Sequence, residues 1–228
     1  MVTPKSYDRA AAALRDAAAD GGRVRLVGSG TRSAWGAPRG EPAVEISTAK
    51  LDAIVEHNAG DLTAVVQAGV PVAKLRKKLA KAGQMLALDP PGEGTVGGLF
   101  ATADSGPLRH RHGAPRDLVL GMTVALSDGT VARTGGKVIK NVAGYDLAKL
   151  FTGSFGTLGL VASVSVRLHP LQSETASAVG ASEDPEALAS AVRSLAALPL
   201  ESDALDVAWD GDGGRVLVRY AGAAAAHQ

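Results

Sequence analysis

The chain has no cysteine among its 228 residues, and this absence excludes several kinds of chemistry. It can form no disulfide, offers no thiolate nucleophile, and holds no zinc ribbon or iron–sulfur cluster through sulfur atoms of its own. Aromatic residues account for only 4% of the chain, so few rings are present on which nucleic-acid bases could stack. Any redox role would therefore depend on a separate electron carrier.

An excess of charge of one sign and long apolar runs are also lacking. The chain has 24 basic and 23 acidic residues, and the net charge of +1 creates no field that would attract nucleic acid or an anionic membrane. No window approaches the roughly 18 consecutive apolar residues of a membrane helix, and the first 22 residues scatter charges among alanines, unlike a signal peptide. With 46% hydrophobic residues, we expect a globular cytoplasmic protein that neither binds nucleic acid nor inserts into a membrane.

The order of predicted elements is typical of an α+β protein. Helices are predicted from Thr3 and Pro4 to the glycine pair at 21–22, from Pro71 to Gly83, and over 146–153. Strands are predicted over 23–27 and 43–47, on both sides of the turns at 58–61 and 127–129, and over 156–170. Alternating Val and Ser or Arg in the last strand predict a sheet with one face in water.

A change of pattern after Pro170 predicts a second domain. A strand over 174–182, a helix over 184–198 and a hairpin around 211–214 follow in the order β-α-β-β. That order is the opening half of a small domain. We therefore divide the chain into a first domain of residues 1–170 and a partial second domain of residues 171–228.

Glycine-rich loops are the main functional signal in the first domain. The loop "VGSGTRSAWG" (27–36) follows a strand, but a G-x-G-x-x-G fingerprint would need a third glycine at Ser33, so an ordinary Rossmann site is excluded. Two interpretations remain. Consecutive backbone N–H groups could bind a pyrophosphate with Arg32 and the nearby hydroxyls of Ser29, Thr31 and Ser33; alternatively, the segment is a plain glycine-rich turn, which its composition alone favours.

Two further loops strengthen the ligand interpretation. In "PPGEGTVGG" (90–98), Thr95 is suited to cap a following helix, whose free N–H groups would face a phosphate. In "ADSGP" (103–107), Ser105 and Gly106 would let a planar ring approach the main chain closely. Each loop alone is compatible with a turn. Together, the three loops predict one large ligand that carries a ring, a sugar and two phosphates.

Other candidates for chemistry are weaker. His110 and His112 would lie on one side of a strand, but no acidic or cysteine partner is adjacent, so we expect a solvated basic loop and no metal site. The neighbouring acidic residues have the pattern of loop carboxylates rather than of an acid–base pair; they are Asp89, Glu93 and Asp104. No serine occupies a nucleophile elbow, and no catalytic residue is assigned.

The run "GGKVIKNVAGYDLAKLFTGSFGTLGLV" (135–161) carries the most informative pattern. Lys137 and Lys140 precede an expected buried pair, Tyr145 and Asp146, and glycines at 153, 156 and 159 lead into a strand. Composition leaves two interpretations open, which are a tightly turned sheet edge and a ligand contact.

Taken with the three loops, this run carries a resemblance to a known family. Residues 20–170 resemble, in the same order, the FAD-binding domain of the vanillyl-alcohol oxidase and p-cresol methylhydroxylase (PCMH-type) flavoproteins. The segment "KNVAGYDL" is most similar to the E-type, FAD-binding subunits of glycolate oxidase. The resemblance implies a PCMH-type fold of two α+β subdomains around FAD, followed by the start of an incomplete α/β cap domain over 171–228.

The resemblance also implies which residues would contact FAD. The pyrophosphate would be held by the loop formed by Gly28, Ser29, Gly30, Thr31, Arg32 and Ser33. The diphosphate and ribose would be lined by Pro91, Gly94, Thr95, Gly97 and Gly98, and the isoalloxazine would be approached by Asp104, Ser105 and Gly106. The backbone near Gly156 and Val161 would meet the cofactor again, and candidates for a positive charge near the pyrimidine edge of the flavin are Lys137, Lys140 and Arg109.

Two departures from the family pattern bear on function. Where some relatives tether FAD covalently through a histidine, this chain has Arg32, so non-covalent FAD is expected. Where the catalytic D-type subunits read GSEGTLG, this chain has Phe155 in place of the glutamate. The histidines and metal ligands that such relatives place near the substrate belong to a complete cap.

The resemblance therefore implies two candidate functions. In the first, the chain is the FAD-binding subunit of a glycolate oxidase-like 2-hydroxy-acid dehydrogenase. There glycolate or D-lactate would give hydride to the flavin N5, and the electrons would pass to an iron–sulfur partner. In the second, the chain is a non-catalytic accessory subunit that supports a catalytic D-type flavoprotein partner.

Overall fold

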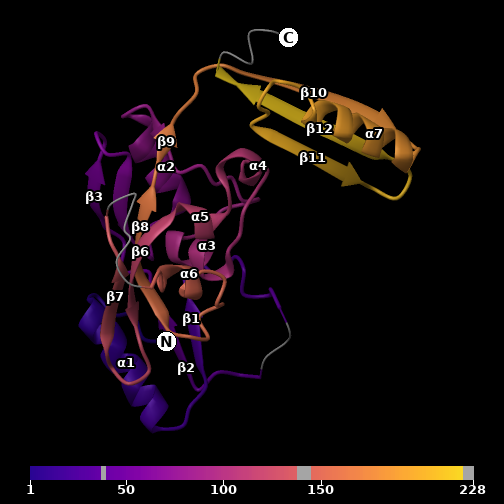
Figure 1. The fold of residues 1–228 in the computed structure, drawn as a ribbon. Helices are drawn as coiled ribbons and strands as arrows, with labels where there is room; N and C mark the ends of the chain where they lie inside the picture. The colour runs from indigo at the N-terminus through magenta and orange to yellow at the C-terminus, as the bar shows by residue number, and fades with distance from the viewer. Residues whose placement is uncertain (37–39, 138–144, 223–228) are drawn as a thin grey trace.

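The computed structural model describes residues 1–36, 40–137 and 145–222, which form a body and a projecting C-terminal sheet (Figure 1). The body is built on a five-stranded antiparallel sheet in the order β3-β4-β8-β6-β7. Its strands are β3 (Ile54–Asn58), β4 (Thr63–Gln67), β6 (Val119–Ala125), β7 (Val131–Gly135) and β8 (Leu160–Arg167). Helices and antiparallel strands therefore combine as an α+β fold, as expected.

Both hairpins predicted in the body are confirmed. Asn58 and Asp61 bracket the turn between β3 and β4, where the Asn58 side chain accepts the Asp61 N–H at 3.2 Å. In the turn between β6 and β7, Asp128 accepts the Thr130 N–H at 2.8 Å, and Gly129 has a φ of +89°. These are the turn positions that asparagine, aspartate and glycine favour, because they bond their own backbone or tolerate positive φ.

The central strand β8 is covered on both faces, so the prediction of one wet face is wrong. Leu160 and Ala162 pack in a smaller core with helix α1 (Tyr7–Ala19), whereas Val164 and Val166 belong to the main core on the other side. Ser163 is buried as well. The pairing of β8 with β6 shifts register between Ser163 and Val161, which marks a β-bulge, so strict alternation breaks there and residues two apart, such as Ala162 and Val164, face different cores.

A smaller subdomain carries the first glycine-rich loop. Its strands β1 (Val24–Val27) and β2 (Val44–Ser47) pair in parallel and lie beside α1. The helix begins at Tyr7 rather than at Pro4, because the Ser6 hydroxyl accepts the Arg9 N–H at 3.3 Å and caps it in place of Thr3. The parallel pairing of β1 and β2 requires a long connection between them, and most of its described residues, 28–36 and 40–43, are exposed.

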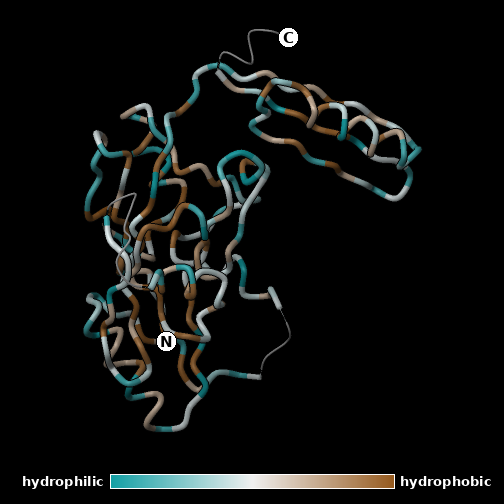
Figure 2. Tube along the Cα trace, in the orientation of Figure 1, coloured by the Kyte–Doolittle hydropathy of each residue, from teal (hydrophilic) through white to brown (hydrophobic). Residues whose placement is uncertain are grey.

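Short helices cover the other face of the five-stranded sheet and enclose the main core. They are α2 (Val72–Ala80), α3 (Val96–Thr102), α5 (Pro115–Leu118) and α6 (Ala148–Phe151). Helix α4 (Arg109–His112) buries no residue and lies outside this core, and β5 (Gln84–Met85) pairs with β9 (His169–Pro170). The helix predicted after Pro71 is confirmed as α2, and its apolar face is buried at Val72, Leu75 and Leu79. Figure 2 shows the apolar residues gathered along the inside of the body.

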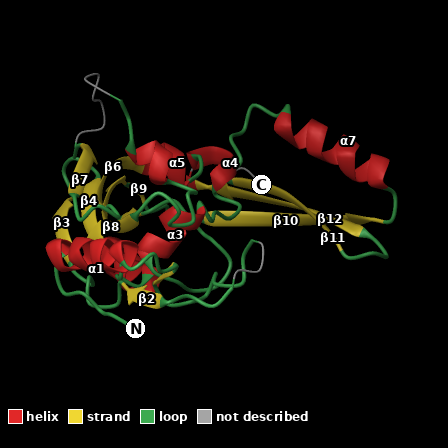
Figure 3. Cartoon of the chain, turned by 90° about the horizontal axis from the view of Figure 1, so that it is seen from below, coloured by secondary structure: helices red, strands yellow, loops and turns green. Residues whose placement is uncertain are grey.

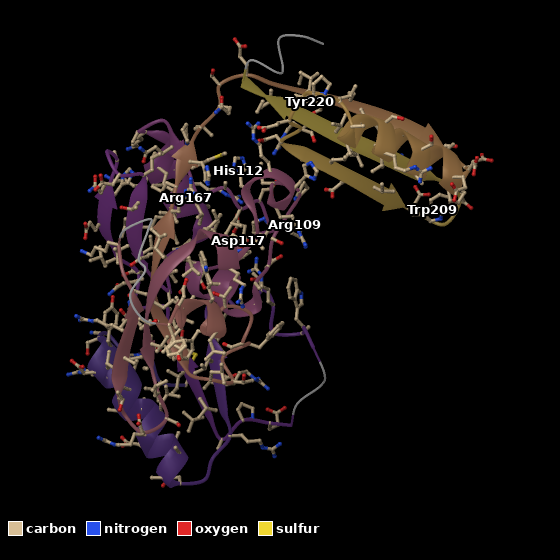
Figure 4. The ribbon with its side chains drawn as sticks, in the orientation of Figure 1. Arg109, His112, Asp117, Arg167, Trp209 and Tyr220 are labelled. Atoms are coloured by element: carbon tan, nitrogen blue, oxygen red, sulfur yellow. The ribbon has the colours of Figure 1, made fainter. Side chains whose placement is uncertain are left out.

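The C-terminal elements form a separate three-stranded sheet with the order β10-β12-β11. They are β10 (Thr175–Ser182), α7 (Pro185–Ala196), β11 (Ala204–Trp209) and β12 (Gly214–Ala221). Helix α7 lies along this sheet (Figure 3) and packs on β10 and β12, burying Leu188. The β-α-β-β order predicted after Pro170 is observed, and Figure 4 places Trp209 at the tip of the sheet farthest from the body.

Candidate functional site

Four loops that are distant in sequence meet in the body. We call them the loop cluster, which comprises residues 28–36, 89–95, 103–107 and 153–157. A β-carbon on Gly28 would lie 2.3 Å from the Thr95 hydroxyl oxygen, so the first two loops are in direct contact. A β-carbon on Gly156 would lie 2.9 Å from Leu26, just before the first loop. The convergence predicted from the sequence is therefore present.

The first loop presents main-chain donors to solvent. In the described part of the chain, the N–H groups of Ser29, Gly30 and Thr31 have no hydrogen-bond acceptor, and all three residues are exposed. Gly30 has a φ of +76°, a conformation that lets successive N–H groups point to one side. The Ser33 hydroxyl, in contrast, donates to the Gly30 carbonyl at 2.8 Å and stabilises the turn itself.

The second loop leads into α3, and the first N–H groups of that helix are hydrogen-bonded within the protein. The N–H of Val96 donates to Val70 at 2.9 Å, that of Gly97 to Ala68 at 2.8 Å, and that of Gly98 to the capping hydroxyl of Thr95. The predicted Thr95 cap is confirmed, but the prediction that this helix offers free N–H groups to a phosphate is wrong. The start of α3 is buried against the connection after β4, whose carbonyl groups accept these N–H groups.

The third loop leaves α3 through a left-handed residue. Ala103 has a φ of +53° and ends the helix, and the next N–H, that of Asp104, bonds back to Leu99 at 3.1 Å. This turn directs Asp104 toward Arg32 of the first loop, with which it forms an ion pair. A β-carbon on Gly106 would lie 1.9 Å from the carbonyl of Asp89, so only glycine fits where these two loops cross.

The fourth loop bonds to the end of α3. Gly153 donates to Phe100 at 3.0 Å, and Phe155 donates to Ala101 at 2.8 Å. Phe155 is a non-glycine residue with a φ of +54° and is half exposed at the surface. Val161 follows in β8, where its side chain is buried in the main core, so of the predicted pair only Gly156 lies in the loop cluster.

Among the described residues, a smaller and a larger pocket lie beside the body, and the smaller one is lined in part by predicted site residues. It has a volume of about 460 Å³ and is lined by Pro91, Ser105, Gly106, Asp89, Pro107, Arg109 and Asp206. The larger pocket, about 800 Å³, lies between α4, β9 and the connection from α7 to β11. The smaller pocket is the better candidate for the planar ring, since the second and third loops both reach it.

The basic candidates are separated by the structure. Arg109 lines the smaller pocket, and Figure 4 shows it on α4, near the C-terminal sheet. Lys137 pairs instead with Glu56 of β3. Lys140 lies outside the described residues. Tyr145 is 91% exposed, so the expected buried pair with Asp146 is wrong.

Helix α4 attaches the body to the C-terminal sheet. His110 and His112 lie on this short helix and not on a strand, because the chain turns here between the third loop and α5. His110 Nε2 lies 3.1 Å from the Ser202 hydroxyl, and His112 Nε2 lies 3.2 Å from Asp203. The basic segment is exposed at Arg109, His110 and Arg111, as expected, and it also contacts the segment that leads into β11, which makes it a docking element. Among the described residues no group of three metal-binding side chains occurs.

Two partly buried groups near these pockets have shifted pKa values. Burial raises the pKa of Asp89 above its usual range, against the N–H of Leu108 and nearby Arg219, which favour the charged form. Burial lowers the pKa of His169 to about 4, and repulsion by His112 and by nearby arginines adds to the shift. At neutral pH His169 is therefore uncharged.

The arrangement fits an extended anionic ligand better than an acid–base reaction. The loop cluster offers free main-chain donors, glycines whose side chains would not fit, and an adjacent pocket. Sequence reasoning missed Asp89, Asp206 and the Arg32–Asp104 pair, because contacts between loops leave no local spacing pattern. No helix among the described residues is long and apolar enough to cross a membrane.

Comparisons with known proteins agree with this geometry. Residues 1–135 match a family model described as FAD binding domain. Glycolate oxidase subunit GlcE of Escherichia coli (strain K12) is 40% identical over 120 residues, which are 51% of this chain and 34% of that protein. Glycolate oxidase subunit GlcD of Bacillus subtilis (strain 168) is 39% identical over 153 residues, or 65% of this chain and 32% of that protein.

A solved structure shares the fold over nearly the whole chain. Alkyldihydroxyacetonephosphate synthase superimposes with a TM-score of 0.75 at 17% sequence identity, covering 97% of this chain and 46% of that one. The similarity includes the C-terminal sheet as well as the body. The chain spans about a third of the length of the two curated relatives above.

Proposed function

The chain belongs to the FAD binding domain family, and from this we propose that it serves as the FAD-binding subunit of a glycolate oxidase-like 2-hydroxy-acid dehydrogenase. The observation that carries the proposal is the loop cluster, in which four glycine-bearing loops meet beside a pocket. Glycolate or D-lactate is the proposed substrate class, because two of the similar proteins are named glycolate oxidase subunits and others are named D-lactate dehydrogenases. A D-type flavoprotein and an iron–sulfur subunit are the proposed partners.

In this proposal the chain's own residues bind and orient FAD. The exposed N–H groups of Ser29, Gly30 and Thr31 hold the pyrophosphate, since oriented main-chain donors form an anion site. The pocket lined by Ser105, Gly106 and Arg109 takes the flavin ring. FAD, when bound, supplies the redox chemistry, and the protein supplies position and electrostatics. With Arg32 at the first loop, the bond to FAD is non-covalent.

The other predicted ligands keep structural places in the same proposal. Pro91 and Gly94 lie in the second loop, where Pro91 also lines the smaller pocket. Thr95, Gly97 and Gly98 shape the start of α3, and their N–H and hydroxyl groups are used within the protein. Gly156 would contribute main chain at the edge of the loop cluster, whereas Val161 would act only through the strand it belongs to.

A second candidate function is an accessory subunit that binds FAD without turning over substrate. The observation in its favour is Phe155, which stands in the fourth loop where catalytic D-type subunits carry a glutamate. Catalysis would then occur in the D-type partner, and this chain would stabilise the complex.

The absorption spectrum of the purified protein separates these functions. We expect a yellow protein with a flavin spectrum, whose visible band bleaches when glycolate or D-lactate is added without oxygen. A yellow protein that bleaches only after a D-type partner is added supports the accessory function. A colourless protein whose colour and thermal stability do not change with added FAD contradicts both.

A further inference from the structure

A buried ion pair ties the first loop to the third. Arg32 donates from Nε to Oδ2 of the Asp104 carboxylate at 2.6 Å, and its Nη2 lies 2.5 Å from the same oxygen. The two side chains are only 7% and 4% exposed. A charge enclosed to this degree is tolerated only with a partner, because water no longer solvates it. The two loops therefore depend on each other for their position.

The third nitrogen of the guanidinium reaches the second loop. Nη1 donates to the hydroxyl of Thr31 at 3.1 Å and to the carbonyl of Glu93 at 3.4 Å. A β-carbon on Gly94 would lie 2.2 Å from Nη1, so the glycine leaves the space that the guanidinium occupies. One side chain thus joins three of the four loops.

We propose that Arg32 is a positioning residue that acts with Asp104, and that it is not itself a ligand of the cofactor pyrophosphate. The inference rests on the proposed binding of FAD to the loop cluster. For Arg32 to turn toward a phosphate, it would have to leave Asp104 buried and unpaired, which is strongly unfavourable. The pyrophosphate is therefore left to the exposed main-chain N–H groups of 29–31.

The pair has a second consequence for affinity. Loops that are already held in the binding geometry lose less conformational freedom when a ligand arrives, so the ligand binds more tightly. Because Arg32 is the one side chain that pairs with the Asp104 carboxylate among the described residues, neutralising Asp104 should harm binding as much as neutralising Arg32. A direct ligand would behave differently, since Asp104 would then compete with the phosphate for the guanidinium.

The test is titration of the FAD-free full chain with FAD, followed by flavin fluorescence at low and high salt. We expect Arg32→Gln and Asp104→Asn each to weaken FAD binding at least tenfold. The double variant should bind FAD as tightly as the single variant with the lower affinity. The salt dependence of the dissociation constant should match the unsubstituted protein, since no phosphate contact is lost. The proposal is overturned if Asp104→Asn binds FAD at least as tightly as the unsubstituted protein and the dissociation constant of Arg32→Gln depends less on salt.

Matched variants keep the test decisive. Arg25→Gln removes the exposed pair with Glu45 in the same subdomain, at 3.1 Å and 41% and 36% exposed, and should leave FAD binding unchanged. If Asp104→Asn fails to fold, Arg32→Lys takes its place in the test. The lysine keeps a positive charge beside Asp104 but lacks the guanidinium nitrogen that reaches Glu93, so FAD binding should still weaken.

Two further outcomes are distinguished by the same measurements. If a variant has a lower melting temperature but shows, below that temperature, unchanged FAD affinity and an unchanged circular dichroism of the bound flavin, the ion pair only stabilises the fold. That outcome overturns the inference. Failure of the unsubstituted protein to bind FAD removes the proposed function itself. Binding by the unsubstituted protein together with unchanged binding by Asp104→Asn removes only the inference.

Discussion

The hydroxyl oxygen of Thr95 lies 2.3 Å from the point where a β-carbon on Gly28 would stand. The same hydroxyl accepts the Gly98 N–H at 3.2 Å and caps α3. The main chain of the first loop therefore packs directly on the cap of a helix in the other subdomain. This contact joins the two subdomains at the proposed cofactor site.

Gly28→Ala should destabilise the protein by about 1–3 kcal/mol, the usual cost of overpacking. The added methyl group either pushes the first loop away or rotates the Thr95 hydroxyl off the Gly98 N–H. The free energy of unfolding from urea titration measures the effect. Gly180→Ala is the control, because no atom lies within 4 Å of its β-carbon position. Equal stability of the two variants would contradict the contact.

Ala103→Gly should stabilise the protein by about 0.5–1 kcal/mol, because glycine relieves a left-handed conformation at φ +53° that is costly for alanine. The gain is limited by the greater freedom of glycine in the unfolded chain. Thermal unfolding measures it. Ala18→Gly, at an exposed position in α1, should have the opposite sign and cost up to about 1 kcal/mol. A loss of stability in Ala103→Gly would contradict the assigned backbone conformation.

Asp203→Asn should loosen the C-terminal sheet from the body. The Asp203 carboxylate is buried and lies 3.2 Å from His112, 3.3 Å from Arg219 and 3.9 Å from Arg111. Loss of its charge should cost about 1–3 kcal/mol, below the full cost of breaking a buried pair, because both arginines are about one-third exposed and screened.

Hydrogen exchange measures this loosening, which should appear as faster exchange in β10 and β11 than in the five-stranded sheet. Asp210→Asn is the matched control, since its pair with Arg215 is more than 60% exposed and lies at the distal hairpin. Uniform exchange throughout Asp203→Asn would show that α4 is not the docking element.

Stability should fall as the pH drops below 6.5, in part through His169. Its folded pKa is about 4, below the ordinary value of 6.5, because burial disfavours the charged ring. The unfolded chain therefore takes up the proton first, so the stabilising contribution is complete above pH 6.5 and is lost as the pH falls toward 4.

Urea unfolding at several pH values between 7.5 and 4.5 tests this. His169→Gln should show a flatter decline than the unsubstituted protein over that interval, because it has no ring to protonate. Parallel declines in the two proteins would rule out His169 as a source of the pH dependence.

Several structural elements could be predicted from the sequence because the interactions that form them join residues close together in the chain. The hairpin at Asp128 and Gly129, the apolar face of α2 and the Thr95 cap each follow from residues within one turn or one helix of each other. The start of α1 was misplaced because Thr3 and Ser6 are both good caps. Only packing decides which of two caps is used.

Local sequence by itself determined most of the helices, strands and glycine loops, though not the short helix α4, because capping, turn chemistry and apolar periodicity act over a few residues. Only the tertiary structure decided which groups those loops offer to a ligand. Among the described residues, the N–H groups of Val96 and Gly97 are bonded within the protein, those of Ser29 to Thr31 are free, and Arg32 is paired with Asp104. These outcomes depend on contacts between residues as much as 72 positions apart, where burial makes every polar group compete for a partner.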